Sequence, residues 1–277
     1  MAAVLSANRF DPANLFAEGI RSLPRQAVAV KGREQADGWG AAVSTAGGRF
    51  KIIKSRGPVS AEKDRFARAA SAVSSGLALA HIRQASNPLG LPREELLGAA
   101  NTQPFSGNGF VFAHNGILEI PAEIKTTLGK YEKLVKGVND SEILFWQVMK
   151  MLDAYGDPAL ALEMAAKETN TVWLSVKDRH PGKKAPYRGL NIFLSNGRTL
   201  WVLCHHPADA GREALMTPGW EFGRIAWRKD AQKIIFASEP LDDGPWRKMP
   251  DLQIAEASLD GGVTLKIKTL GSLTSGL

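Results

Sequence analysis

The chain has 277 residues with a formal net charge of +7, and its 44% hydrophobic and 23% charged residues are ordinary proportions for a folded protein. Its single cysteine excludes an intrachain disulfide and favours a reducing compartment. No apolar run approaches the ~18 residues of a membrane span, and the N-terminus lacks a secretory signal, so we expect a cytoplasmic protein with no membrane partner.

Short apolar segments alternate with helical patterns in the first half of the chain. Residues 2–6, 37–44, 49–55, 77–82 and 109–114 have the length and apolar content of strands. The spacing of apolar positions predicts helices over residues 61–75, 143–152 and 158–167. Asp140 suits the N-cap of the middle helix, because a carboxylate there accepts from free backbone N–H groups.

The last third of the chain has mainly β character. Strands are expected over residues 189–194, 199–205, 233–238 and 262–268, and Asn196-Gly197 between the first two predicts a hairpin. Cys204 lies in an apolar run, which indicates a buried structural thiol. Helices in the middle with strands on both sides predict an α+β protein of one domain, residues 1–277, with two sheets and a helical layer.

Positive charge is densest between Lys177 and Arg188, where five lysines and arginines alternate with proline and glycine. The prolines and the glycine predict an exposed loop whose charge is solvated. A docking site for an acidic protein is the second interpretation. A nucleic-acid partner is not expected, because the charge forms no arginine-rich helix or aromatic-basic array.

A polar segment, His81-Ile82-Arg83-Gln84-Ala85-Ser86, ends and follows the fourth expected strand. The planar guanidinium of Arg83 can bind a carboxylate through two parallel hydrogen bonds, and the Ser86 hydroxyl can add a third. The alternative for Arg83 is an ion pair with a purely structural role.

The fifth expected strand leads into Phe112-Ala113-His114-Asn115-Gly116. The side-chain amide of Asn115 and a nearby backbone N–H form a pair of donors suited to a developing oxyanion. Taken alone, Asn-Gly is also a common turn. His114 is expected to orient this loop rather than to bind a metal.

Four motifs in this order resemble class II glutamine amidotransferases, which are N-terminal-nucleophile enzymes. They are Asp37-Gly38-Trp39-Gly40, Ala80-His81-Ile82-Arg83-Gln84-Ala85-Ser86, Phe112-Ala113-His114-Asn115-Gly116 and Asn139-Asp140-Ser141-Glu142. The resemblance implies a four-layer α/β/β/α sandwich of two antiparallel sheets. It continues weakly over residues 189–197 and 237–241, which look like late strands of stand-alone members such as the ergothioneine-pathway γ-glutamyl hydrolase.

The resemblance also implies roles for individual residues. Arg83 and Ser86 would hold the α-carboxylate of a glutamyl group, and Asp140 would accept from its α-ammonium group. Asn115 and Gly116 would form the oxyanion hole. The implied ligand is glutamine or another γ-glutamyl small molecule, with no cofactor.

Other motif positions are not expected to be catalytic. The glycines of residues 37–40 make room beside the nucleophile, and the tryptophan of this motif packs. In Asn101-Thr102-Gln103-Pro104-Phe105, Gln103 stands where the family has a histidine, and a glutamine cannot titrate near neutral pH. His205 and His206 are adjacent on an expected strand and point to opposite faces, so no metal site is expected.

The nucleophile of the family is a cysteine directly after the initiator methionine, with its own α-amino group as the base. Here that position is Ala2, which cannot attack an amide. Either the alanine is an engineered or recent change, or the chain is a natural pseudo-amidotransferase acting as a subunit of a larger complex. In the first case, cysteine at position 2 should restore cleavage of a γ-amide through a glutamyl thioester.

Overall fold

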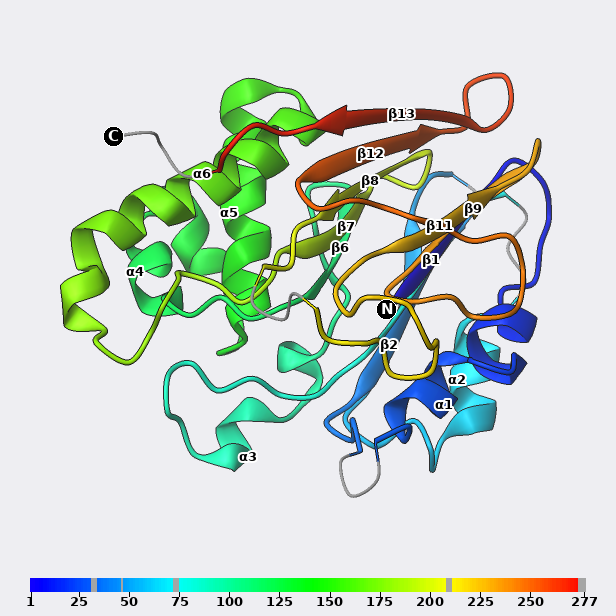
Figure 1. Ribbon diagram of the computed structural model, residues 1–277, viewed down its shortest axis with the longest axis horizontal. Coiled ribbons are helices and arrows are strands. Elements are labelled where there is room, and N and C mark those ends of the chain that lie inside the picture. The colour runs from blue at the N-terminus through cyan, green and yellow to red at the C-terminus, as the bar shows by residue number, and fades with distance from the viewer. Residues whose placement is uncertain (31–33, 46, 72–74, 208–210, 274–277) are drawn as a thin grey trace.

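Two antiparallel sheets lie face to face, and helices cover the outer side of each (Figure 1). The computed structural model describes residues 1–30, 34–45, 47–71, 75–207 and 211–273. In this part of the chain the first sheet has the strand order β11-β9-β10-β1-β4-β2-β3, and the second has the order β13-β12-β8-β7-β6-β5.

Both ends of the chain contribute to the first sheet. Its strands are β1 (Ala2–Ser6), β2 (Trp39–Ser44), β3 (Phe50–Ser55), β4 (Gly76–Ile82), β9 (Ala226–Lys229), β10 (Lys233–Ala237) and β11 (Arg247–Lys248). The strands of the second sheet are β5 (Phe105–Gly107), β6 (Phe110–Asn115), β7 (Asn191–Ser195), β8 (Thr199–Cys204), β12 (Gln253–Ser258) and β13 (Thr264–Thr269). The motif strands β4 and β6 therefore lie in opposite sheets, and their ends meet only because the sheets stack.

Strand β1 lies in the middle of the first sheet, hydrogen-bonded to β4 on one side and to β10 on the other. Successive residues of a strand face opposite sides of its sheet. Met1, Ala3 and Leu5 face the core between the two sheets. Ala2 and Val4 face the opposite way, into the core beneath the outer helices.

The helices form the two outer layers (Figure 1). On the second sheet lie α4 (Pro121–Thr126), α5 (Asp140–Tyr155) and α6 (Pro158–Val176), and on the first lie α1 (Leu23–Ala27) and α2 (Lys63–Ala69). Shorter helical segments are η1 (Asn14–Glu18), α3 (Arg93–Leu96), η2 (Ala99–Asn101), η3 (Gly129–Leu134) and η4 (Lys177–Arg179). The expected α+β sandwich with four layers, α/β/β/α, is confirmed.

The ends of α5 and α6 differ from the expected ones. The N-cap of α5 is Asn139, whose side chain accepts from the Ser141 N–H, so the expectation for Asp140 was wrong and its carboxylate is free to bond elsewhere. Helix α6 runs nine residues past its expected end at residue 167, to Val176. Thr169 and Asn170 bond back to carbonyls one turn earlier, which accommodates residues with little helix propensity.

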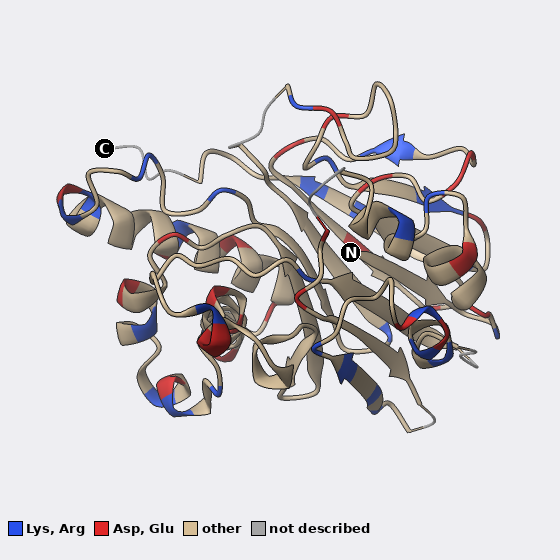
Figure 2. Cartoon of the chain, turned by 90° about the horizontal axis from the view of Figure 1, so that it is seen from below, with Lys and Arg blue, Asp and Glu red and all other residues tan. Residues whose placement is uncertain are grey.

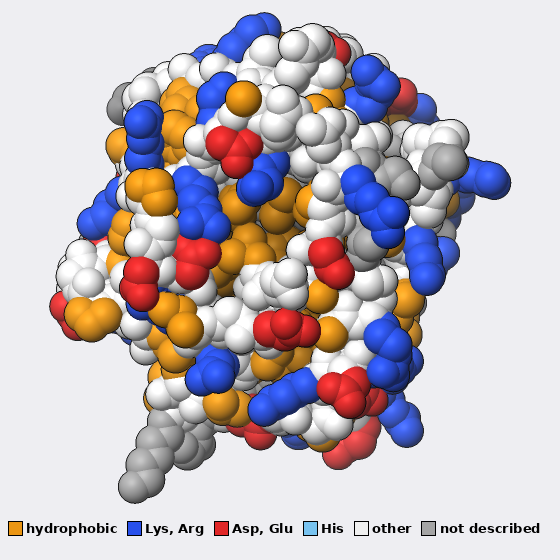
Figure 3. All heavy atoms as spheres, turned by 90° about the vertical axis from the view of Figure 1, so that its right-hand side faces the viewer, with side chains coloured by type: hydrophobic (Ala, Val, Ile, Leu, Met, Phe, Trp, Pro, Cys, Tyr) orange, Lys and Arg blue, Asp and Glu red, His pale blue; other side chains and the backbone are white. Residues whose placement is uncertain are grey.

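Charged residues lie mostly on helices, loops and sheet edges, and the inner strands contain few of them (Figure 2). One face of the molecule shows apolar side chains in a hollow with basic and acidic side chains around it (Figure 3). None of the described helices is long and apolar enough to cross a membrane.

Candidate active site

A cavity of about 270 Å³ opens where β4 and β6 end. The loop after β4 supplies Arg83 and Ser86, and the end of β6 supplies Asn115 and Gly116. Residues from the second half of the chain complete the wall, namely Arg188, His206, Arg212 and Phe222. The structure thus brings together the residues of two separate sequence motifs in one cavity.

Arg83 is the buried cation of this cavity, with only 3% of its surface exposed. Its backbone N–H donates to the Gly38 carbonyl, and its carbonyl accepts from the Asp37 N–H, so the loop is tied to the start of β2. The guanidinium has one long hydrogen bond, 3.4 Å to the Asp37 carbonyl, and no carboxylate of a described residue lies within 4.0 Å of it. Burial lowers the pKa of this guanidinium, and the charges of Asp37 and Asp140 oppose that shift.

Asp37 holds the arginine loop from the side of β2. One carboxylate oxygen accepts from the Ala85 N–H at 2.8 Å, and the other is paired with Arg93. Trp39 packs edge-on against Phe66, as expected for a packing residue. The Asp37-Gly38-Trp39-Gly40 motif therefore positions the loop that carries Arg83, a role that its sequence did not reveal.

Gly40 is the point of closest approach between β2 and the segment at residues 103–104. A Cβ at Gly40 would lie 2.2 Å from the Gln103 carbonyl oxygen, so the expectation that this glycine makes room is confirmed. The Gln103 side chain accepts from the His114 N–H at 2.6 Å and donates to the His114 carbonyl at 3.0 Å. Gln103 thus braces the end of β6 through both ends of its amide.

Ser86 and Asp140 lie together beside the arginine loop. The Ser86 hydroxyl donates to one oxygen of Asp140 at 2.8 Å, and the Leu118 N–H donates to the other at 2.7 Å. Ser86 lines the cavity, whereas Asp140 lies directly behind it, next to the lining residues Asn139 and Ser141. Each carboxylate oxygen has two lone pairs, so Asp140 can accept a further hydrogen bond.

Asn115 and Gly116 line the cavity at the end of β6. The Asn115 side-chain amide donates to the Ser238 hydroxyl at 3.2 Å. A Cβ at Gly116 would lie 2.0 Å from the Gly189 carbonyl oxygen, so only glycine fits here. The two residues supply a side-chain N–H and a backbone N–H at one end of the cavity, which suits an oxyanion.

His114 directly precedes Asn115 and Gly116, and both of its ring nitrogens have hydrogen-bond partners. Its Nε2 lies 2.9 Å from the Gly189 carbonyl, which can only accept, so Nε2 carries the proton and Nδ1 accepts from the Ser141 hydroxyl at 2.9 Å. Burial lowers the pKa of His114, and the nearby charge of Asp140 opposes this. A neutral imidazole with two fixed partners orients the loop, as the sequence predicts.

Buried neutral histidines give the protein a specific pH dependence. Burial also holds the pKa of His81 well below 6.5, so below that pH the unfolded chain binds protons that the folded chain excludes. We expect the contribution of these two histidines to the free energy of unfolding to be complete above about pH 6.5 and to be lost as the pH decreases below it. Urea titrations of the protein and of His114→Gln between pH 7.5 and 5.5 check this. In the variant the free energy of unfolding should change less with pH. An unchanged pH dependence would exclude His114 as its source.

The start of β1 adjoins a smaller cavity of about 80 Å³, which shares His81 and Asn115 with the first. Met1 lines this smaller cavity, and its carbonyl accepts from the Ser238 N–H at 2.9 Å. Burial lowers the pKa of its α-ammonium group to about 5, so this amine is neutral at pH 7. Ala2 is fully buried, lines neither cavity and faces the outer core.

Cys204 lies in the core between the sheets, and burial raises the pKa of its thiol to about 12. The expectation of a buried structural thiol is confirmed. No group of three or more histidine, cysteine, aspartate or glutamate side chains that could hold a metal ion occurs in the described ranges.

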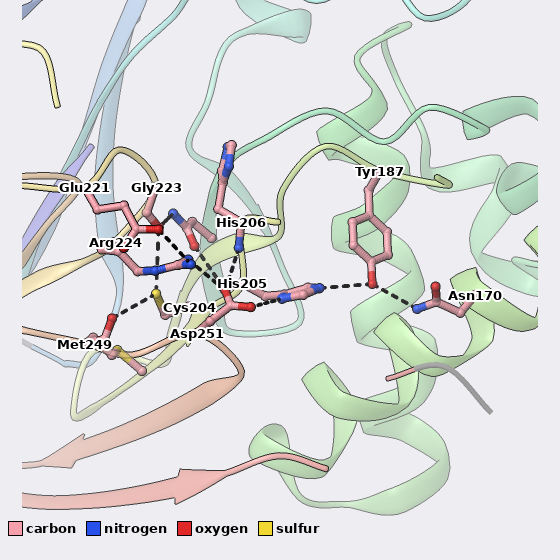
Figure 4. A network of polar contacts seen from close by, with 11 residues as sticks. Asn170, Tyr187, Cys204, His205, His206, Glu221, Gly223, Arg224, Met249 and Asp251 are labelled. Carbon is pink, nitrogen blue, oxygen red and sulfur yellow. Dashed lines mark hydrogen bonds and ion pairs between the residues drawn. The ribbon is translucent and has the colours of Figure 1, made fainter. Parts of the chain in front are cut away.

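A polar network behind the cavity fixes the turn that carries His205 and His206 (Figure 4). Asp251 accepts from the backbone N–H of His206 and pairs with Arg224 through one oxygen, and its other oxygen lies 3.1 Å from the His205 ring. The two imidazoles point in different directions, and that of His206 leaves the network and lines the cavity. Single residues in loops carry this part of the site, so no motif indicated them.

The four-layer fold is similar to that of known glutamine amidotransferases. The family model for class II glutamine amidotransferases matches residues 22–217, and the chain belongs to this family. No curated protein sequence matches the chain.

Two solved structures share the fold. A glutamine aminotransferase class-II domain protein from Silicibacter pomeroyi is 18% identical, with 97% of this chain and 99% of that chain covered and a TM-score of 0.62. Glutamine phosphoribosylpyrophosphate amidotransferase from B. subtilis, complexed with ADP and GMP, is 14% identical, with 96% of this chain covered and a TM-score of 0.62. This chain spans 48% of the length of the B. subtilis protein.

Proposed function

We propose that the cavity binds the glutamyl half of glutamine or of another γ-glutamyl amide. The observation that carries this proposal is the buried guanidinium of Arg83, which lines the cavity without a carboxylate partner among the described residues. A buried cation without a counter-ion is costly, and the α-carboxylate of a glutamyl group supplies the missing charge with bidentate geometry. The Ser86 hydroxyl, which donates to Asp140 in the unliganded site, turns toward this carboxylate, and the Asp140 oxygen that it leaves accepts from the α-ammonium group.

The γ-amide then lies against Asn115 and Gly116. Attack on its carbonyl carbon places negative charge on the carbonyl oxygen, and the two N–H donors stabilise that charge. Collapse of the tetrahedral species expels the amine, which takes up a proton, and leaves an acyl group on the nucleophile. With a thiol nucleophile this product is a glutamyl thioester, which water hydrolyses to glutamate and free thiol.

Neither Met1 nor Ala2, at the start of β1, supplies such a nucleophile. The thioether of Met1 has no proton to lose, and the side chain of Ala2 has no heteroatom. We therefore expect the protein as it stands to bind γ-glutamyl ligands and to turn them over negligibly.

Because successive residues of β1 face opposite sides of its sheet, the position of an introduced cysteine decides which side it faces. A residue in the place of Met1 faces the smaller cavity, and a residue in the place of Ala2 faces the outer core. Two forms should be compared, Ala2→Cys and a cysteine inserted between Met1 and Ala2, each with the initiator methionine removed. We expect the insertion to release glutamate from a γ-glutamyl amide at a rate well above that of Ala2→Cys. Failure of both forms across a panel of γ-glutamyl amides rules out the cleavage reaction.

A second proposed function is that of a non-catalytic subunit of a larger complex. The absence of a nucleophilic side chain at Met1 and at Ala2 favours it, and the exposed basic residues between Lys177 and Arg188 offer a contact surface. The two cysteine-bearing forms separate the proposals. Release of glutamate by either form removes most of the support for the subunit, and failure of both forms strengthens it.

A further inference from the structure

The cavity carries more positive charge than a glutamyl group requires. Three arginines line it, namely Arg83, Arg188 and Arg212, and none of the described residues that line it is an aspartate or glutamate. The α-carboxylate of a glutamyl group accounts for Arg83 alone. The remaining positive charge lies along the part of the wall formed by the second half of the chain.

Arg188 is fixed next to the oxyanion pair. Its backbone N–H donates to the Ile117 carbonyl at 2.9 Å, and the next residue, Gly189, lies against Gly116. Its side chain is exposed and has no acidic partner within 4.0 Å among the described residues. The guanidinium is therefore available at the mouth of the cavity, near the place where the γ-amide lies.

A second hollow, of about 550 Å³, lies along the basic loop. Arg188 lines both spaces, and Lys183 and Lys184 line the hollow with Glu119. Lys183 is held by Glu119, since its ammonium bonds to the Glu119 carbonyl and lies 3.8 Å from the carboxylate. A group that extends from the amide nitrogen past Arg188 thus enters a positively charged groove.

Arg212 adds a further positive charge to the wall of the main cavity. Its guanidinium lies 4.4 Å from the centre of the Phe222 ring, and that ring lines both the main cavity and the smaller one at Met1.

We propose that Arg188 recognises a carboxylate on the amine half of the substrate, so that the preferred ligands are γ-glutamyl amino acids rather than glutamine. This inference rests on the proposed γ-glutamyl binding and names the substrate class of that site. The amine half then carries its carboxylate toward the basic groove while the glutamyl half stays on Arg83.

Two ligands that differ only in this charge test the proposal. L-γ-glutamylglycine and L-γ-glutamylglycinamide have nearly the same shape, and only the first has a second carboxylate. Calorimetry on the full chain as it stands should give about fivefold tighter binding of γ-glutamylglycine, in line with an exposed charge pair. In Arg188→Gln the two affinities should become equal, whereas Lys184→Gln, in the same loop but outside the main cavity, should keep the preference.

Each outcome of this experiment is decisive. If both ligands bind the unaltered protein equally well, or if Arg188→Gln keeps the preference, the subsite does not exist while the glutamyl site stands. If neither ligand nor L-glutamine binds, the proposed function fails together with the subsite. Thermal melting shows that each variant is folded, which is expected because both side chains are exposed.

Discussion

Replacing Asn115 with alanine should lower the turnover of an active, cysteine-bearing form of the protein by about 100-fold or more. The side-chain amide of Asn115 lies at the cavity wall and donates, in the unliganded site, to the Ser238 hydroxyl at 3.2 Å. During attack on the γ-amide the same N–H can donate to the developing oxyanion, where a charged acceptor makes the bond stronger. The loss therefore falls on kcat, and ground-state affinity changes much less.

Ser238→Ala is the matched control for this prediction. It removes the resting partner of the Asn115 amide but leaves the donor itself, so turnover should fall far less than in Asn115→Ala. Steady-state kinetics on the two variants, with ligand binding measured separately, distinguish them. Equal losses in both variants, or a loss confined to KM, would show that Asn115 only maintains the local structure.

Replacing Arg83 with alanine should weaken the binding of L-glutamine or a γ-glutamyl amide by at least about tenfold. Truncating one partner of a buried, hydrogen-bonded charge pair costs roughly 2 to 5 kcal/mol, and ~1.4 kcal/mol corresponds to one decade in affinity. The measurement is calorimetry on the chain as it stands, since no turnover is expected to consume the ligand. The fold should survive, because Arg83 contributes little apolar area to any core.

Arg93→Ala is the control for nonspecific effects of removing a cation near the site. The Arg93 side chain is 63% exposed and pairs with Asp37, which holds the arginine loop from outside the cavity. Its loss should cost much less affinity than the loss of Arg83. An unchanged affinity in Arg83→Ala would refute the assignment of the α-carboxylate to this residue.

Local patterns predicted most of the sheet framework. The expected segments 2–6, 49–55 and 199–205 correspond to β1, β3 and β8 within one residue at each end, because apolar content and turn residues bound them. The hairpin at Asn196-Gly197 joins β7 to β8, and the Asn196 side chain accepts from the next two N–H groups after Gly197. In these places local chemistry and the tertiary structure agree.

Other elements had no local signal. Strand β12 has the sequence Gln253-Ile254-Ala255-Glu256-Ala257-Ser258, which lacks β-branched runs and resembles a helix, yet its pairing with β8 and β13 makes it a strand. The helix expected over residues 61–75 is described only as α2, Lys63–Ala69, and residues 72–74 lie outside the described part of the chain. Tertiary pairing decided the case of β12.

The candidate site also contains residues that the sequence predicted and residues that it did not. Arg83, Ser86, Asn115 and Gly116 line the cavity because they belong to compact motifs at strand ends. The contribution of Gln103 depends on the His114 backbone, and that of Arg188 depends on a contact with Ile117 across the fold. Such roles arise from distant segments that meet, so a single sequence cannot reveal them.

The central place of β1 also has a consequence for the order of events in folding. This strand leaves the ribosome before the other described strands, but one of its two neighbours, β10, is more than 220 residues away in the chain. Pairing at such separation carries a large loop-closure entropy, whereas α5 and α6 follow each other in the chain and pack on one another. The helices should therefore form early, and the first sheet should close only after residues 233–237 have been synthesised. The strand that begins at the candidate active site is then among the last to be secured on both sides.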